Sequence, residues 1–254
     1  MTPADCTAMK RRGEKLAVLT AYDYPTARLL DESGIDILLV GDSLGMVVLG
    51  FPDTTHVTME HMLHHTTAVA RGTQRALIVA DLPVASYDTP GQAVANARRL
   101  IAAGAHAVKL EGGASHAARI AAIVAIGIPV MAHLGMLPQS IREEGGYKLK
   151  GKTPESADAI LTDALAVESA GTFAVVLELV KADVAQRIST ALQIPTIGIG
   201  SGAGCDGQVL VTHDLIGLFP WFTPKFARQY AQVAASIRSA ATTFLRETKS
   251  GSAF

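Results

Sequence analysis

The most constraining feature of this sequence is a set of short apolar segments that recurs along its whole length. Each segment has three or four residues, is rich in Val, Ile and Leu, and in most cases runs continuously instead of alternating with polar residues. Continuous apolar runs are typical of strands covered on both faces, as in a parallel sheet wrapped by helices. The predicted strands are 17–20, 37–40, 77–80, 107–110, 130–132, 174–177, 196–199 and 209–211.

Helical patterns separate these apolar segments. The predicted helices are 23–33, 58–70, 90–103, 115–126, 156–170, 183–192 and 226–248. Thr89 precedes a proline and Thr58 precedes an apolar-periodic run, and both residues are predicted to cap a helix start. A helix–glycine–strand pattern recurs at Gly34, Gly104 and Gly171. We expect each of these glycines to end a helix.

About eight alternating β and α units, with no charge-rich or Pro/Ser-rich linker between them, favour an α/β fold that closes into a (β/α)8 TIM barrel. An open doubly wound sheet is the alternative. The length of 254 residues suits one such barrel, because these barrels commonly run to roughly 250 residues. We therefore expect a single domain over 1–254, with an N-terminal extension at 1–14 and the helix 226–248 packing outside the barrel.

Composition and charge exclude several classes of protein. The 22 Lys and Arg against 23 Asp and Glu leave a formal charge of −1, which argues against nucleic-acid binding through bulk charge. The most membrane-like stretch, 120–137, is interrupted by glycine and proline and is too broken for a spanning helix. Two cysteines cannot form a disulfide framework, and no apolar run follows the basic N-terminal residues. We expect a cytoplasmic protein with no membrane partner.

Charged side chains lie where the predicted strands end. They are Asp42, Asp81, Lys109, Glu111, His133 and Glu178. Because all strand ends of a barrel meet at one mouth, four carboxylates would share a small and partly desolvated space. Capping of the following helices is the alternative role for Asp42 and Asp81. A hard divalent cation explains the whole set better, since carboxylate oxygens suit Mg²⁺. We predict Asp42 and Asp81 as direct ligands, with Glu111 binding directly or through a water.

A cation held there would chelate a 2-oxo acid and stabilise the enolate formed when the neighbouring carbon loses a proton. Glu178 follows a wholly apolar strand and is the predicted base, the alternative being a buried acid paired with Lys109. Lys109 faces either the barrel interior or the ring of helices. We expect the interior, where it would bind the substrate carboxylate. His133 is either a substrate contact at the mouth or a core histidine bonded to backbone.

Nine short motifs together resemble the ketopantoate hydroxymethyltransferase family. They are TAYD at 20–23, VGDSLGM at 40–46, ADLP at 80–83, VKLEGG at 108–113, HLG at 133–135, PQS at 138–140, GGYK at 145–148, IGIG at 197–200 and PKF at 224–226. The resemblance implies a magnesium-dependent enzyme of pantothenate biosynthesis. Such an enzyme moves a one-carbon unit from 5,10-methylenetetrahydrofolate to 3-methyl-2-oxobutanoate, giving 2-dehydropantoate and tetrahydrofolate. It also implies a homo-oligomer, typically a decamer.

The resemblance assigns roles to the residues of the mouth. Asp42, Asp81 and Glu111 match the family's metal positions, and Glu178 matches its proton acceptor. Ser43 joins Asp42, Asp81 and Lys109 as a contact of the oxo acid. Ala132, Lys150 and Lys152 depart from the family pattern, so the folate contacts are left unassigned.

Two other functions fit part of the pattern. The first is a barrel enzyme that cleaves or rearranges carbon–carbon or carbon–phosphorus bonds, as in the isocitrate lyase and phosphoenolpyruvate mutase families. Such an enzyme needs a loop nucleophile, for which Cys205 is the candidate, although the adjacent Asp206 disfavours a thiolate. The second is a non-catalytic sensor of oxo acids, which would have no use for Glu178 as a base.

Overall fold

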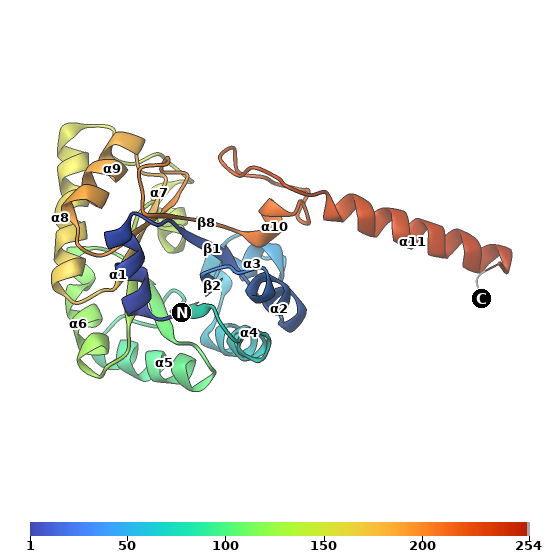
Figure 1. The fold of residues 1–254 in the computed structure, drawn as a ribbon, viewed down its shortest axis with the longest axis horizontal. Coiled ribbons are helices and arrows are strands. Elements are labelled where there is room, and N and C mark those ends of the chain that lie inside the picture. Colours follow the sequence, from blue (N-terminus) through green and yellow to red (C-terminus); the bar gives the residue numbers. More distant parts are fainter. Residues whose placement is uncertain (253–254) are drawn as a thin grey trace. The chain divides into compact units, whose positions relative to one another are not determined.

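Eight parallel strands form the centre of the molecule and close into a barrel (Figure 1). The computed structural model describes residues 1–252. The strands are β1 Leu16–Thr20, β2 Ile37–Val40, β3 Leu77–Asp81, β4 Ala107–Glu111, β5 Val130–Gly135, β6 Ala174–Glu178, β7 Thr196–Ile199 and β8 Gly207–Leu210. Each strand pairs in parallel with the next along the chain, and the Leu16 amide donates to Asp206 O at 2.9 Å where β1 meets the start of β8. The predicted (β/α)8 TIM barrel is confirmed, and closure rules out the open sheet.

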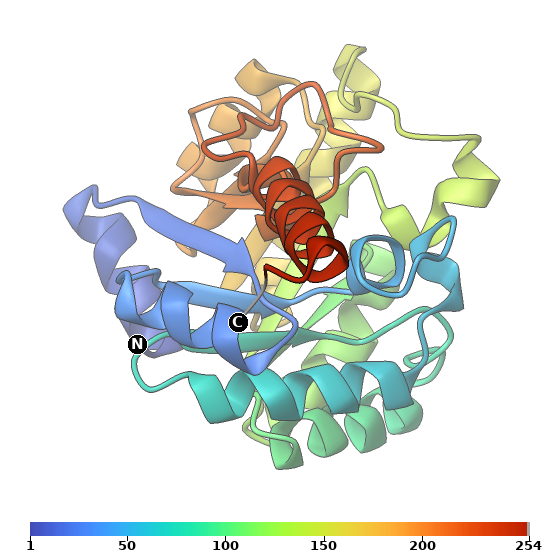
Figure 2. The same ribbon diagram turned by 90° about the vertical axis from the view of Figure 1, so that its right-hand side faces the viewer.

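Helices alternate with the strands along the chain, and those before Val209 surround the barrel. The α-helices are α1 Pro3–Arg12, α2 Tyr24–Glu32, α3 Leu44–Val47, α4 Met59–Gly72, α5 Pro90–Ala102, α6 Ala117–Ala125, α7 Ile141–Glu144, α8 Pro154–Ser169, α9 Ala182–Ala191, α10 Thr212–Leu215 and α11 Val233–Ser250. Three short 3₁₀ turns are η1 Thr54–His56, η2 Ala114–His116 and η3 Pro138–Ser140. Figure 2 shows α4 and α5 side by side, and Arg99 of α5 pairs with Glu60 of α4.

The predicted helix ends are confirmed at several places. Thr58 caps α4 and Thr89 caps α5 through side-chain bonds to backbone amides. The three glycines of the repeated pattern, Gly34, Gly104 and Gly171, all have positive φ angles, which glycine adopts without strain. Capping residues and glycines therefore set the length of these helices, as the sequence indicated.

Each strand divides its side chains between two apolar cores. On β2, Ile37 and Leu39 point into the barrel, while Leu38 and Val40 pack against the surrounding helices. This alternation follows from the two-residue period of a strand. Both faces are buried, which is why the strand sequences are continuously apolar. The same period decides which side chains reach the interior at the mouth.

The N-terminal segment 1–14 contains a helix that the sequence analysis did not predict. Helix α1 begins with a capping box between Thr2 and Asp5 and ends at Gly13. Its Cys6 side chain is fully buried in the core that fills the barrel, and Lys10 pairs with Asp206 at 2.9 Å. The segment is therefore part of the barrel's packing as well as an extension of the chain.

The chain divides into two compact units, and the second begins at Leu210. This second unit contains α10 and α11, and α11 begins at Val233 instead of residue 226. The predicted helix start is wrong because the preceding residues use their backbone groups elsewhere. The Tyr230 amide, for example, donates to Leu215 O at 2.8 Å. Within residues 1–252 no helix is long and apolar enough to cross a bilayer.

Candidate active site

The predicted site residues all come from the carboxyl ends of the strands. On β3, Leu77 and Val79 line the barrel interior, and the same alternation directs Asp81 inward. By the same alternation Lys109 and Glu111 reach the interior from β4, His133 from β5 and Glu178 from β6. Asp42 lies two residues after β2. All six side chains are buried, from 1% exposed for Asp81 to 8% for Glu178.

Lys109 and two aspartates form the first half of the site. The Lys109 ammonium donates to Asp81 Oδ1 at 2.6 Å, and the Asp42 amide donates to Asp81 Oδ2 at 3.1 Å. Burial lowers the pKa of Lys109, but the carboxylates of Asp81 and Asp42 outweigh it and raise that pKa overall. Burial and the negative charges of Asp81 and Glu111 raise the pKa of Asp42 to about 8. The prediction that Lys109 faces the interior is confirmed.

His133 lies between two carboxylates in the second half of the site. Its Nδ1 is 3.4 Å from Glu111 Oε1, and its Nε2 is 3.2 Å from Glu178 Oε2. Burial lowers the pKa of His133, but Glu111 and Glu178 reverse this and raise it to about 9. Neither ring nitrogen forms a hydrogen bond within residues 1–252, so the alternative of a core histidine bonded to backbone is wrong. So is the pairing of Glu178 with Lys109, since Lys109 bonds to Asp81.

Gln139 of η3 connects the two halves. Its side-chain amide donates to Asp42 Oδ2 at 2.8 Å, and its backbone amide donates to Glu111 Oε2 at 3.1 Å. The sequence analysis gave Gln139 no role, although it stands in the PQS motif at 138–140. Tyr87 was missed entirely, and its hydroxyl donates to Gln139 Oε1 at 2.5 Å. No spacing rule marks either residue, because both enter the site from loops.

Ser43 lies next to the acidic cluster. Its hydroxyl is 2.7 Å from the hydroxyl of Tyr22, which is fully buried. The side chain of Ser43 does not cap α3, and α4 and α5 are capped by Thr58 and Thr89. The capping alternative for Asp42 and Asp81 is therefore wrong. Their carboxylates instead accept hydrogen bonds inside the site, Asp42 from Gln139 and Asp81 from Lys109.

The backbone around Glu178 is held tightly. Gly135 approaches so closely that a Cβ there would lie 2.3 Å from Glu178 O, and the Met136 amide donates to that oxygen at 2.8 Å. The next residue, Leu179, has a φ of 47°, a left-handed conformation that a branched side chain rarely adopts. Strain of this kind is typical of functional sites, where the surrounding structure enforces it. Here the strained residue directly follows Glu178 at the mouth.

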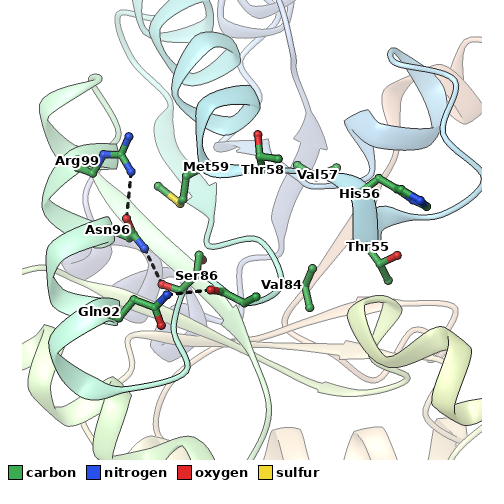
Figure 3. Close-up of a pocket in the computed structure, with 11 residues that line it drawn as sticks. Thr55, His56, Val57, Thr58, Met59, Val84, Ser86, Gln92, Asn96 and Arg99 are labelled. Carbon is green, nitrogen blue, oxygen red and sulfur yellow. Dashed lines mark hydrogen bonds between the residues drawn. The ribbon is translucent and has the colours of Figure 1, made fainter.

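A cavity of about 380 Å³ lies beside the site, between the loops that follow β2 and β3 (Figure 3). Its wall includes residues 84–86, which Gln92 and Asn96 of α5 hold through bonds to Ala85 O and Ser86 O. The same loop continues into Tyr87, which contacts Gln139. One loop therefore borders both the cavity and the acidic cluster.

The donor set of the cluster suits a divalent cation. Four carboxylates face one ammonium and one imidazolium, which leaves two negative charges uncompensated when all six groups are ionised. Glu111 Oε1 is buried without a hydrogen-bond partner. Among residues 1–252, no three acidic, histidine or cysteine side chains stand in a ready-made ligand arrangement. A cation would therefore have to draw these carboxylates together in competition with the bond between Lys109 and Asp81.

Fold and site together define an enzyme of the (β/α)8-barrel class, with its reactive groups at the carboxyl ends of the strands. A sequence model of the family "Ketopantoate hydroxymethyltransferase" matches residues 1–253. The chain belongs to this family. Two relatives named 3-methyl-2-oxobutanoate hydroxymethyltransferase, from Syntrophus aciditrophicus and Acetivibrio thermocellus, are 53% and 54% identical to it. The alignments cover 99% and 98% of this chain, and 93% and 89% of the relatives.

Solved structures share the fold at low identity. Phosphoenolpyruvate phosphomutase from Streptomyces platensis subsp. rosaceus is 20% identical with a TM-score of 0.67, over 99% of this chain and 88% of the other. A phosphonopyruvate hydrolase, solved with oxalate and Mg²⁺, is 15% identical with a TM-score of 0.65, over 99% and 88%. The mutase alternative needed a reactive Cys205. That thiol is 1% exposed, and burial raises its pKa, which disfavours the thiolate.

Proposed function

We propose that this chain transfers a hydroxymethyl group from 5,10-methylenetetrahydrofolate to 3-methyl-2-oxobutanoate, giving 2-dehydropantoate and tetrahydrofolate in pantothenate biosynthesis. The observation that carries this proposal is the family match over residues 1–253, together with the contacts that join every predicted charged site residue at one mouth. Relatives with this name are more than half identical along almost the whole chain.

The proposal includes a Mg²⁺ ion held by Asp42, Asp81 and Glu111. It is supported by an all-oxygen donor set, by four carboxylates facing only two basic side chains, and by Glu111 Oε1, which accepts no hydrogen bond from the described residues. When bound, the ion would polarise the keto oxygen of the oxo acid and offset the negative charge that develops there.

The chain's own residues would bind and orient the oxo acid. The Lys109 ammonium and the Ser43 hydroxyl would hold its carboxylate, with Asp42 and Asp81 alongside. His133 stands between the two glutamates, and its Nε2 lies 3.2 Å from Glu178 Oε2. The backbone of Glu178 is held by the close approach of Gly135, and its carboxylate lies against the His133 ring.

The proton moves to Glu178 from C3 of the oxo acid. The electron pair left at C3 then forms a bond to the methylene carbon of the folate, and that carbon gives up its two bonds to N5 and N10. Water supplies the hydroxyl group on the same carbon. The second proton of the water and the proton taken from C3 end on the two nitrogens of tetrahydrofolate.

The assembly proposed for the chain is a homo-oligomer, with a decamer as the family expectation, in the cytoplasm. Apolar side chains exposed on the barrel's helices support an association surface, among them Leu29 at 64% and Leu165 at 43% exposure. Sedimentation analysis would give the subunit number, and a monomer at micromolar concentration would contradict this part of the proposal.

Proton exchange at C3 of 3-methyl-2-oxobutanoate in deuterated water tests the chemistry without folate. Wild-type protein is expected to catalyse exchange with Mg²⁺ and to lose it when the ion is chelated. Asp42→Asn is expected to lower the exchange rate more than about 100-fold, because it removes a ligand charge without changing size. Asp183→Asn, at an exposed carboxylate, is the matched control and should exchange like wild type.

The outcomes separate the possible functions. A protein that binds the oxo acid without exchanging its proton would be a sensor, and the transferase proposal would be wrong. Exchange that survives chelation, or that Asp42→Asn leaves unchanged, would refute the metal site while leaving the base in place. Release of tetrahydrofolate when the folate is added completes the assignment.

A further inference from the structure

Gln139 makes four hydrogen bonds, one to β4 and three to the loops that follow β2 and β3. Its Nε2 donates to Asp42 Oδ2 at 2.8 Å and to Leu82 O at 3.0 Å. Its Oε1 accepts from the Tyr87 hydroxyl at 2.5 Å, and its backbone amide donates to Glu111 Oε2 at 3.1 Å. The residue is only 8% exposed, so these partners replace water.

The orientation of the Gln139 amide follows from its partners. A backbone carbonyl such as Leu82 O can only accept, so the NH₂ end must face it. The opposite end then meets the Tyr87 hydroxyl, which donates. If the amide were turned over, its oxygen would face Leu82 O and the Asp42 carboxylate. All three groups are hydrogen-bond acceptors, so neither bond could form. Only one orientation satisfies the whole set.

Gln139 therefore hydrogen-bonds to only one of the two oxygens of each carboxylate. Gln139 engages Oδ2 of Asp42 and Oε2 of Glu111. The other oxygen of Glu111, Oε1, accepts no hydrogen bond in the described part of the chain and lies 3.4 Å from His133 Nδ1. One residue therefore orients carboxylates that come from the ends of β2 and β4, which are far apart in the sequence.

The geometry points to Gln139 as a positioning residue that holds Asp42 and Glu111 for a divalent cation, with Tyr87 locking its amide in place. This inference rests on the proposed metal site. Groups that hydrogen-bond to metal ligands fix the ligand's orientation, and their loss lowers metal affinity about 10- to 100-fold. Gln139 is suited to the task because its amide donates to a carboxylate without adding charge, whereas a glutamate would repel both acids.

Mg²⁺ titration of the metal-free full-length protein, followed by calorimetry, tests the role without any turnover. Gln139→Met keeps the length of the side chain and removes both amide functions. It is expected to weaken Mg²⁺ binding about 10- to 100-fold while saturating Mg²⁺ restores most of the C3 exchange rate. Tyr87→Phe removes only the bond to Oε1, and a loss of about 2- to 10-fold is expected. Gln193→Met, at an exposed glutamine, is the control and should bind like wild type.

The outcomes distinguish this inference from the proposed function. If wild type binds Mg²⁺ and a folded Gln139→Met variant binds it equally well, the positioning role is wrong and the metal site stands. If wild type binds no Mg²⁺, the metal site fails and the inference fails with it. Should Gln139→Met not fold, Tyr87→Phe decides, since wild-type affinity in that variant overturns the inference. A purely structural role would lower the melting temperature and leave the Mg²⁺ affinity unchanged.

Discussion

The two ends of the barrel differ in character although the same strands build both. At the amino end the inward side chains are apolar, as with Leu16, Ile37 and Leu77, and Cys6 of α1 joins them. At the carboxyl end the inward positions carry charge, as with Asp81 and Glu178. Along β3 the inward series passes from Leu77 through Val79 to Asp81 within five residues. The two-residue period of the strand decides which side chains point into the barrel. Their distance along the strand decides whether they belong to the apolar core or to the charged mouth.

The energetic consequences of the two ends are opposite. Burying an apolar side chain at the amino end stabilises the fold by about 1.5–3 kcal/mol. Burying charge at the mouth is unfavourable unless partners compensate, and the rise of the Asp42 pKa to about 8 shows incomplete compensation. The amino end therefore holds the barrel together, while the mouth keeps charges that stability alone would remove.

Glu178→Gln would produce the largest effect at the mouth. The amide has the size of the carboxylate but cannot accept the C3 proton, so the exchange rate is expected to fall about 10²- to 10⁴-fold. Binding of the oxo acid and of Mg²⁺ should persist, which calorimetry would measure. Chemical denaturation would measure the free energy of unfolding of this variant, for comparison with a variant at the amino end. An amino-end variant is not expected to lose activity to a comparable extent. Normal exchange in this variant would remove Glu178 as the base.

Leu77→Ala tests the amino end on the same strand as Asp81. Leu77 is 1% exposed and lies in the barrel-filling core, so truncation is expected to lower the free energy of unfolding by about 2–5 kcal/mol. The exchange rate per folded molecule should stay within about twofold of wild type, because the space left by the truncated Leu77 side chain lies away from the charged groups of the mouth. Urea denaturation and the exchange assay give the two values. If Leu77→Ala lost much of its C3 exchange rate but kept the free energy of unfolding of wild type, the amino end would not be the structural end of the barrel.

Thr89→Ala is expected to have the smallest effect on stability of the variants considered. It tests whether a residue on the mouth side can affect stability without affecting the exchange rate. Thr89 lies in the loop after β3, on the mouth side, but its hydroxyl accepts from the Gln92 amide at 3.2 Å and caps α5. Its loss is expected to lower the free energy of unfolding by about 0.5–2 kcal/mol. Exchange should not change, since Thr89 contacts none of the charged groups. A strong fall in exchange would mean that the cap also positions the Tyr87 loop.

Much of the site could be predicted because charge stands out at the end of an apolar strand. Asp81, Lys109 and Glu178 follow this rule. The strand period left Lys109 facing either the interior or the helices, and the structure confirms the expected interior position. Gln139 could not be predicted, since it enters from a 3₁₀ turn and its role depends on carboxylates 28 and 97 residues away. Tyr87 was missed for the same reason.

Errors in the fold prediction came from segments whose partners are distant. Helix α1 has a weak apolar pattern, and its single buried residue, Cys6, makes sense only inside the barrel. The start of α11 was placed seven residues early, because the segment before Val233 uses its backbone groups on α10 residues such as Leu215. Local patterns contain no information on either contact.

By itself the sequence determined the succession of strands and helices, because side-chain periodicity and capping act over a few residues. It also determined which strands end in charge. Tertiary structure alone decided the pairings, since which carboxylate meets Lys109, His133 or Gln139 depends on barrel closure bringing distant strand ends together. The physical reason is range: helix and strand signals are local, whereas electrostatic and hydrogen-bond partners are chosen across space.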